Sequence, residues 1–130
     1  MQKIKKNILK PFLLVCLGLA LTTITFARMG NRKPSPPGRP EATNINRFGC
    51  TLTYLAPQDW GGAVITRYYI EVQETWERRW TLHGDTGYLQ YDVISVKNNV
   101  EYQFRVLAEN AAGLSDPSIP CKPIEFSDPF

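Results

Sequence analysis

Beyond residue 40, apolar side chains recur at every second position, and this alternation limits the possible folds more than any other feature of the sequence. Cys50, Leu52 and Tyr54 fall on one side of a strand, with Thr51 and Thr53 on the other. Two further stretches share the pattern: Tyr68, Ile70 and Val72, and Tyr102, Phe104, Val106 and Ala108. Successive side chains of a β-strand point to opposite faces, so a period of two indicates half-buried strands. The sequence therefore predicts an all-β domain.

Turn residues such as Gly61-Gly62 and Asn98-Asn99 separate these stretches. Seven strands are expected, at residues 41–46, 49–56, 64–73, 78–83, 88–94, 100–109 and 117–125. Each apolar face is too small to be stable alone, so two antiparallel sheets should pack face to face as an immunoglobulin-like β-sandwich. The predicted core consists of Tyr54, Tyr68, Trp80, Tyr91, Val93, Val96, Phe104 and Val106.

Residues 1–27 differ in character from the rest of the chain. They contain four lysines and no acidic residue, and an apolar run spans residues 12–21 before the small residue Ala27. This order is typical of a secretory signal peptide, and an uncleaved signal anchor is the alternative. Without this leader the net charge changes from +3 to −1, because 15 basic residues become 11 against 12 acidic ones. The basic balance therefore indicates no nucleic-acid partner, and membrane contact is expected only through an uncleaved leader.

Residues 28–40 contain four prolines and two glycines in 13 positions. Proline has no backbone N–H, so it neither continues a helix nor fits inside a sheet. The segment is interpreted as an extended linker before a domain at residues 41–126, which a short tail at 127–130 follows. Residues 34–39 also fit the polyproline pattern that SH3-type domains bind.

Several segments resemble a fibronectin type III domain. They are residues 36–41 (PPGRPE), 51–54 (TLTY), 61–68 (GGAVITRY) and 102–118 (YQFRVLAENAAGLSDPS), and their order matches from about residue 36 to the end of the chain. The Gly61-Gly62 pair, the turn at residues 110–113 and the ending at 127–130 are most similar to domains of giant muscle proteins of the titin and twitchin type. The resemblance implies the same seven-stranded sandwich and a non-catalytic role.

The resemblance also implies roles for single residues. Tyr102 should form a tyrosine corner, in which its hydroxyl bonds to backbone upstream. Tyr54 stands where the family usually has tryptophan, which leaves a smaller ring whose hydroxyl could reach the rim. Tyr54, Tyr68, Tyr102 and Phe104 are the predicted structural residues.

No arrangement of side chains in the sequence indicates catalysis, a metal site or a cofactor. His83 is the single histidine, and its Gly-rich loop with Asp85 lacks a nucleophile. Cys16 lies in the leader, whereas Cys50 and Cys121 fall on predicted strands of opposite sheets. Two free thiols are expected for this last pair, and a disulfide is the alternative.

A contact with another protein is expected where the loop before residue 64 meets the loop after residue 109. Trp60 lies in the first loop, and Asn110, Leu114 and Ser115 lie in the second. Tryptophan is favoured at binding hot spots, so these residues form the predicted contact patch. The alternative is that Trp60 covers the rim of its own core.

A second candidate surface consists of Trp76, Arg78 and Arg79, where stacking of Trp76 on an arginine is the structural alternative. Two functional interpretations remain open. The leader favours a secreted or membrane-tethered recognition or adhesion module. The resemblance favours a cytosolic spacer domain of a titin- or twitchin-like muscle protein, to which a leader has been joined in error.

Overall fold

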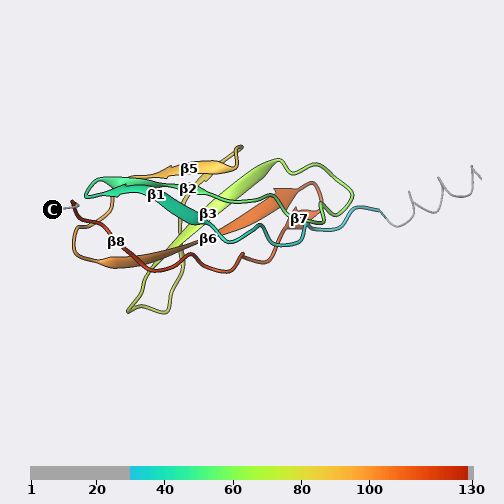
Figure 1. Cartoon of the computed structure of the whole chain (residues 1–130). Helices are drawn as coiled ribbons and strands as arrows, with labels where there is room; N and C mark the ends of the chain where they lie inside the picture. Colours follow the sequence, from blue (N-terminus) through green and yellow to red (C-terminus); the bar gives the residue numbers. More distant parts are fainter. Residues whose placement is uncertain (1–29, 129–130) are drawn as a thin grey trace, which may run out of the picture. The chain divides into compact units, whose positions relative to one another are not determined.

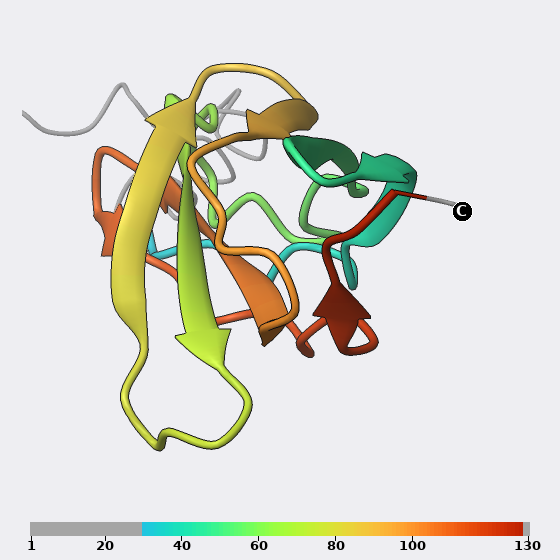
Figure 2. The ribbon, with the colours of Figure 1, turned by 90° about the vertical axis from the view of Figure 1, so that its left-hand side faces the viewer.

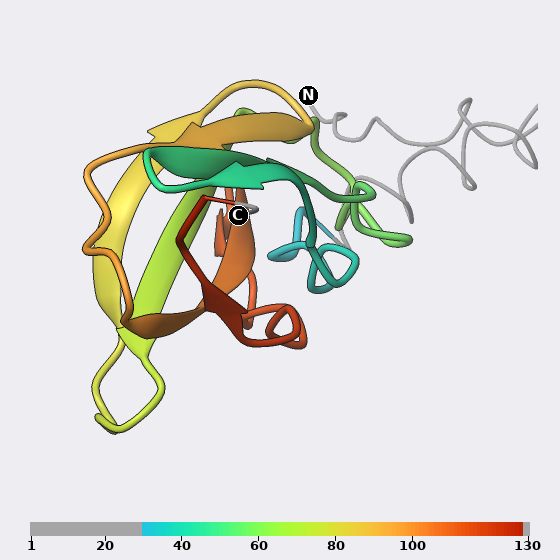
Figure 3. The same ribbon diagram turned by 60° about the vertical axis from the view of Figure 1, so that its left-hand side comes forward.

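The computed structural model describes residues 30–128, and all regular structure in this range is β-strand. The strands are β1 (Glu41–Asn46), β2 (Gly49–Thr53), β3 (Arg67–Glu74), β4 (Thr81–Thr86), β5 (Gln90–Val93), β6 (Glu101–Asn110), β7 (Gly113–Leu114) and β8 (Ile124–Glu125). One sheet has the order β1-β2-β5 and the other β4-β3-β6-β7, with β8 also paired to β6. All pairs are antiparallel, and the two sheets lie face to face (Figures 1 and 3). The predicted all-β sandwich is confirmed.

The core fills the space between the two sheets. Phe104, Phe126, Leu52 and Ile70 are fully buried, and the rings of Phe104 and Phe126 meet edge to face at 6.3 Å. Five predicted core residues are buried: Tyr54, Tyr68, Val93, Phe104 and Val106. Two more, Tyr91 and Val96, are partly buried and pack against the core. Burying one large apolar side chain stabilises a fold by about 1.5–3 kcal/mol, so these positions account for the pairing of the sheets.

Trp80 was expected in the core, and this prediction was wrong. β4 begins at Thr81, so Trp80 precedes the strand and lies on the outer surface, half-buried. The guanidinium of Arg105 stacks on its ring at 4.3 Å and donates a hydrogen bond of 2.7 Å to Glu71. Within residues 30–128 no arginine stacks on Trp76, and its indole N–H donates to the Glu74 carboxylate at 3.0 Å.

The predicted final strand, residues 117–125, is replaced by β7, β8 and an irregular segment between them. This segment has proline at every third position, namely Pro117, Pro120 and Pro123, and proline cannot donate to a ladder. Three residues before and between the prolines each donate their backbone N–H to a carbonyl of β6: Ser115, Ser118 and Cys121. The edge of β6 is therefore covered without a regular strand.

Both cysteines in the described residues are free thiols and buried. The Sγ of Cys121 accepts a hydrogen bond of 3.3 Å from the backbone N–H of Phe104. Burial raises the pKa of the Cys50 thiol to about 12 and also raises that of Cys121. Both thiols are therefore protonated at neutral pH and are poor nucleophiles.

Two tyrosine hydroxyls fasten loops to the sandwich. Tyr102 accepts a hydrogen bond of 3.0 Å from the backbone N–H of Lys97, as the tyrosine corner requires. Tyr54 donates to the carbonyl of Tyr88 at 2.8 Å, so its hydroxyl does reach the rim. The rings of Tyr54 and Tyr68 lie 5.4 Å apart between the sheets.

Candidate partner-binding site

The segment before β1 is bonded to the loop between β2 and β3. The backbone N–H of Arg32 donates to the carbonyl of Gly61 at 2.7 Å, and that of Ser35 donates to the carbonyl of Asp59 at 2.9 Å. The Arg32 guanidinium also pairs with the Asp59 carboxylate at 3.0 Å. The compact unit accordingly extends back to Asn31, into the segment predicted as a linker, while the predicted leader at 1–27 lies outside the described residues.

Asn110, at the end of β6, joins this segment to two loops. Its side-chain amide donates to the carbonyls of Arg32 and Trp60, both at 2.7 Å. Its Oδ1 accepts from the backbone N–H of Ala112 at 2.8 Å and of Gly113 at 3.2 Å. Both N–H donors of this side chain and its oxygen acceptor are thus hydrogen-bonded, and Asn110 is only 3% exposed.

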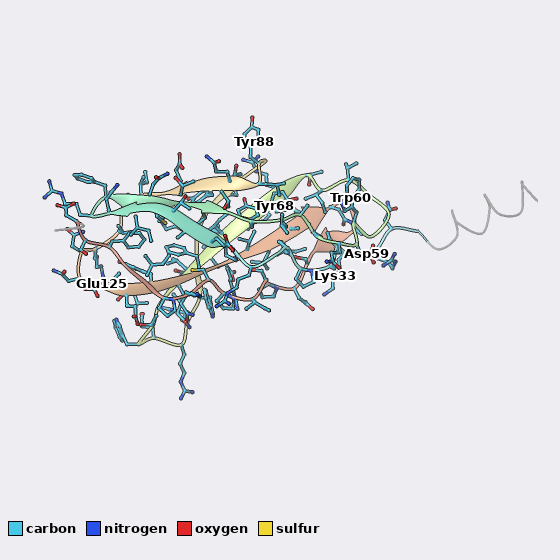
Figure 4. The ribbon with its side chains drawn as sticks, viewed as in Figure 1. Lys33, Asp59, Trp60, Tyr68, Tyr88 and Glu125 are labelled. Carbon is cyan, nitrogen blue, oxygen red and sulfur yellow. The ribbon has the colours of Figure 1, made fainter. Side chains whose placement is uncertain are left out.

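Asp59 shapes the loop that carries Trp60. Its carboxylate accepts a hydrogen bond of 2.9 Å from the backbone N–H of Gly61. This bond, followed by the pairing with Arg32, lowers the pKa of Asp59 below its ordinary value. The carboxylate therefore stays ionised at neutral pH and fixes the turn at residues 59–61. Figure 4 shows Lys33, Asp59 and Trp60 at the same end of the sandwich.

An apolar depression of about 240 Å³ lies beside this turn. Trp60 and Val64 from the β2–β3 loop and Leu89 from the β4–β5 loop line it, together with Ala56, Ile65, Tyr68 and Gly87. We call Trp60, Val64 and Leu89 the rim patch; these side chains are 54%, 66% and 44% exposed. A larger hollow of about 560 Å³ beside β4 and β5 is lined mainly by polar side chains, so it is less suited to an apolar contact.

The predicted contact residues are divided by the structure. Trp60 and Leu114 are exposed, whereas Asn110 and Ser115 are buried and have structural hydrogen bonds. Leu114 lies on β7 and does not line the depression. Val64 and Leu89 were not predicted as contact residues, because each looks like one more apolar strand residue in the sequence. Only the loop geometry brings them beside Trp60.

His83 lies on β4 rather than in a solvated loop, and a β-bulge turns it inward. Ile70 pairs with Gly84 while Glu71 pairs with Leu82, so His83 is the extra residue. Its Nδ1 lies 2.8 Å from the Tyr91 hydroxyl, and its Nε2 lies 3.0 Å from the carbonyl of Ile94. Because a carbonyl only accepts, Nε2 carries a proton, and in the neutral imidazole Nδ1 accepts from the Tyr91 hydroxyl.

Comparisons with known proteins agree with this geometry. The sequence model of the fibronectin type III domain matches residues 35–124. The chain belongs to the fibronectin type III family. Titin of Drosophila melanogaster is 37% identical over 95 residues, which is 73% of this chain. The smooth-muscle myosin light chain kinase of Gallus gallus is 32% identical over 87 residues, which is 66% of this chain.

Solved structures show the same fold. Domains A168–A170 of titin superpose with a TM-score of 0.72 at 36% identity, covering 74% of this chain and 33% of that one. This chain covers 5% of the length of that myosin light chain kinase and, to the nearest per cent, 0% of the length of titin. Within residues 30–128 there is no helix that could cross a membrane.

Proposed function

We propose that this fibronectin type III domain is a non-catalytic module that binds another protein through the rim patch. The observation that carries the proposal is a tryptophan left half exposed at the edge of an apolar depression. Tryptophan is enriched at interface hot spots, where it fills pockets that exclude water. Val64 and Leu89 add apolar surface beside it, as the centre of a protein contact requires.

The rigidity of the loops supports this proposal. The loop that carries Trp60 is held by Asn110 from β6 and by Asp59 within its own turn. Such a loop loses little conformational freedom when a partner binds, so more of the contact energy appears as affinity. The Tyr54 hydroxyl holds the β4–β5 loop in a similar way through the carbonyl of Tyr88.

Two settings are proposed for the module. The relatives are long proteins that include a smooth-muscle myosin light chain kinase, which supports a spacer and binding domain within a muscle protein. The signal-peptide pattern of residues 1–27 supports an exported recognition or adhesion module instead. N-terminal sequencing of the protein from its own cells, together with its cell fraction, separates the two settings. An N-terminus near residue 28 in the medium supports export, whereas an intact leader sequence in the cytosol excludes it.

The binding role is tested by selecting protein ligands for the full chain from a displayed library and comparing three variants. Trp60→Ser and Val64→Ser change the rim patch, whereas Leu82→Ser changes an exposed leucine on the outer face of β4. We expect Trp60→Ser to weaken the selected ligands by roughly thirtyfold or more, as hot-spot truncation does. Leu82→Ser should leave the affinity unchanged. Ligands that depend on Leu82 and ignore Trp60 would exclude the rim patch as the site.

A further inference from the structure

Two adjacent basic residues, one further residue and then a hydroxyl residue occur twice in this chain. The first copy is Arg32-Lys33-Pro34-Ser35, and the second is Arg78-Arg79-Trp80-Thr81. Basophilic protein kinases bind such arginines through acidic pockets, because guanidinium groups pair with carboxylates in a fork geometry. The two copies look alike in the sequence, but they differ in the structure.

The first copy is fully occupied by contacts within the domain. Arg32 pairs with Asp59 and Lys33 with Asp116, each at 3.0 Å. The Ser35 hydroxyl accepts from the backbone N–H of Asp59 at 3.0 Å. A kinase would have to break all of these contacts to bind this copy.

The two arginines of the second copy are free on the surface. Arg78 and Arg79 are exposed, and neither forms a salt bridge or a side-chain hydrogen bond within residues 30–128. Residues 77–80 have no regular structure and lie in the loop that joins β3 to β4 and protrudes from the sandwich (Figure 2). Thr81 is exposed, and its hydroxyl has one long contact of 3.5 Å, to the carbonyl of Val72.

We propose that Thr81 is a phosphorylation site for a basophilic serine/threonine protein kinase, which recognises Arg78 and Arg79. In this step the Thr81 Oγ1 attacks the γ-phosphorus of ATP, and the bond to the β–γ bridging oxygen breaks. ADP leaves, and the hydroxyl proton passes to the catalytic aspartate of the kinase. The product carries a charge of about −1.5 to −2 at the first residue of β4.

Trp80 acts as a latch on this site. A kinase cleft takes its substrate as an extended chain, so Thr81 must leave the edge of the sheet and Trp80 must leave Arg105. β4 is an edge strand, and the pairing of Thr81 with Val72 is the last of its ladder. The stack of Arg105 on the Trp80 ring at 4.3 Å is a further contact, and it holds Trp80 against the outer face of the sheet. Removing Arg105 should therefore speed the reaction.

The test uses the full chain, ATP and the catalytic subunit of cyclic-AMP-dependent protein kinase, with the modified residue located by tandem mass spectrometry. We expect one phosphoryl group on Thr81. Arg78→Ala and Arg79→Ala should each lower the initial rate by roughly tenfold or more, since each removes a charge-assisted contact with the kinase. Arg105→Ala should raise the rate, and Thr81→Val should abolish it.

Ser35→Ala is the matched control, because Ser35 belongs to the first copy, whose side chains already form contacts within the domain. Its initial rate should equal that of the unchanged chain. Phosphate on Ser35 instead of Thr81 would overturn the proposal. So would a folded chain that is not phosphorylated while a heat-unfolded one is, or an initial rate that ignores both arginines. An Arg105→Ala rate no higher than that of the unchanged chain would exclude the latch.

Discussion

Ser118 and Val106 exchange two hydrogen bonds across the edge of the five-stranded sheet. The backbone N–H of Ser118 donates to the carbonyl of Val106 at 2.8 Å, and the Val106 N–H donates to the Ser118 hydroxyl at 3.0 Å. Two neighbouring pairs have the same arrangement: Ser115 with Ala108, and Cys121 with Phe104. Short polar side chains at every third position thus replace the backbone carbonyls that a regular strand would offer to β6.

Ser118→Ala should destabilise the domain more than its size suggests. The Val106 N–H would remain buried without an acceptor, and leaving such a donor unpaired costs about 1–3 kcal/mol. Ser127→Ala is the control, because Ser127 is exposed and no hydrogen bond of its side chain occurs within the described residues. Urea unfolding gives both free energies. A Ser118→Ala loss no larger than that of the control would show that the hydroxyl does not support the edge.

Gly84 leaves room for the phenol of Tyr91, and a larger residue there should be costly. A Cβ at this position would collide with the Tyr91 hydroxyl, which bonds to His83 across the two sheets. We expect Gly84→Ala to lower the free energy of unfolding by about 1–3 kcal/mol, as overpacking of a core does. Adding Tyr91→Phe should restore part of the loss by removing the colliding oxygen.

Gly87→Ala is the control for this variant. The nearest atom to its added methyl group is 3.7 Å away, in the Arg67 guanidinium, so little change in stability is expected. Equal losses for Gly84→Ala and Gly87→Ala would contradict the packing described for Tyr91.

Much of the fold could be predicted from the sequence, because period two is a direct consequence of strand geometry. That pattern correctly placed Tyr54, Tyr68, Phe104 and Val106 in the core. Trp80 was misplaced because strand boundaries are the weakest part of such predictions, and a shift of a few residues moved it to the outer face. Phe126 was not predicted as a core residue, because it follows the segment with Pro117, Pro120 and Pro123, where no alternation marks an inward position.

The candidate site could be predicted only in part. Trp60 is conspicuous in the sequence, since a tryptophan in a loop is unusual. The sequence does not show that the Asn110 side chain turns inward, because the same residue in a turn could equally face solvent. The grouping of Val64 and Leu89 with Trp60 depends on two loops that are distant in sequence, and alternation within a strand carries no information about it.

Asn110→Asp should release the segment before β1. Carboxylate oxygens cannot donate, so the bonds to the carbonyls of Arg32 and Trp60 would be lost and a buried charge would face them. We expect a loss of at least about 2 kcal/mol in the free energy of unfolding and faster trypsin cleavage after Arg32. Asn99→Asp, at an exposed position, is the matched control. Cleavage after Arg32 that stays as slow as in this control would show that the Asn110 side chain does not hold the segment before β1 in place.

The buried thiols should react with Ellman's reagent only when the domain unfolds. Because burial raises the pKa of Cys50 to about 12, little thiolate is present at about pH 8. The folded state favours the protonated thiol, so this stabilisation is complete below the ordinary value of 9.0 and is lost as pH rises towards 12. The experiment uses a Cys16→Ser chain, so that only Cys50 and Cys121 remain. Rapid labelling of either thiol in the absence of denaturant would contradict the burial described for both.

The central claim is that the rim patch contacts a protein partner, and site-specific photo-crosslinking in the protein's own cells tests it most directly. A benzophenone amino acid replaces Val64 in one chain and Leu82, on the outer face of β4, in another. We predict a crosslinked protein from position 64 that disappears when Trp60→Ser is added, with no such product from position 82. A crosslink from position 82 alone, or one from position 64 that persists without Trp60, would contradict the account.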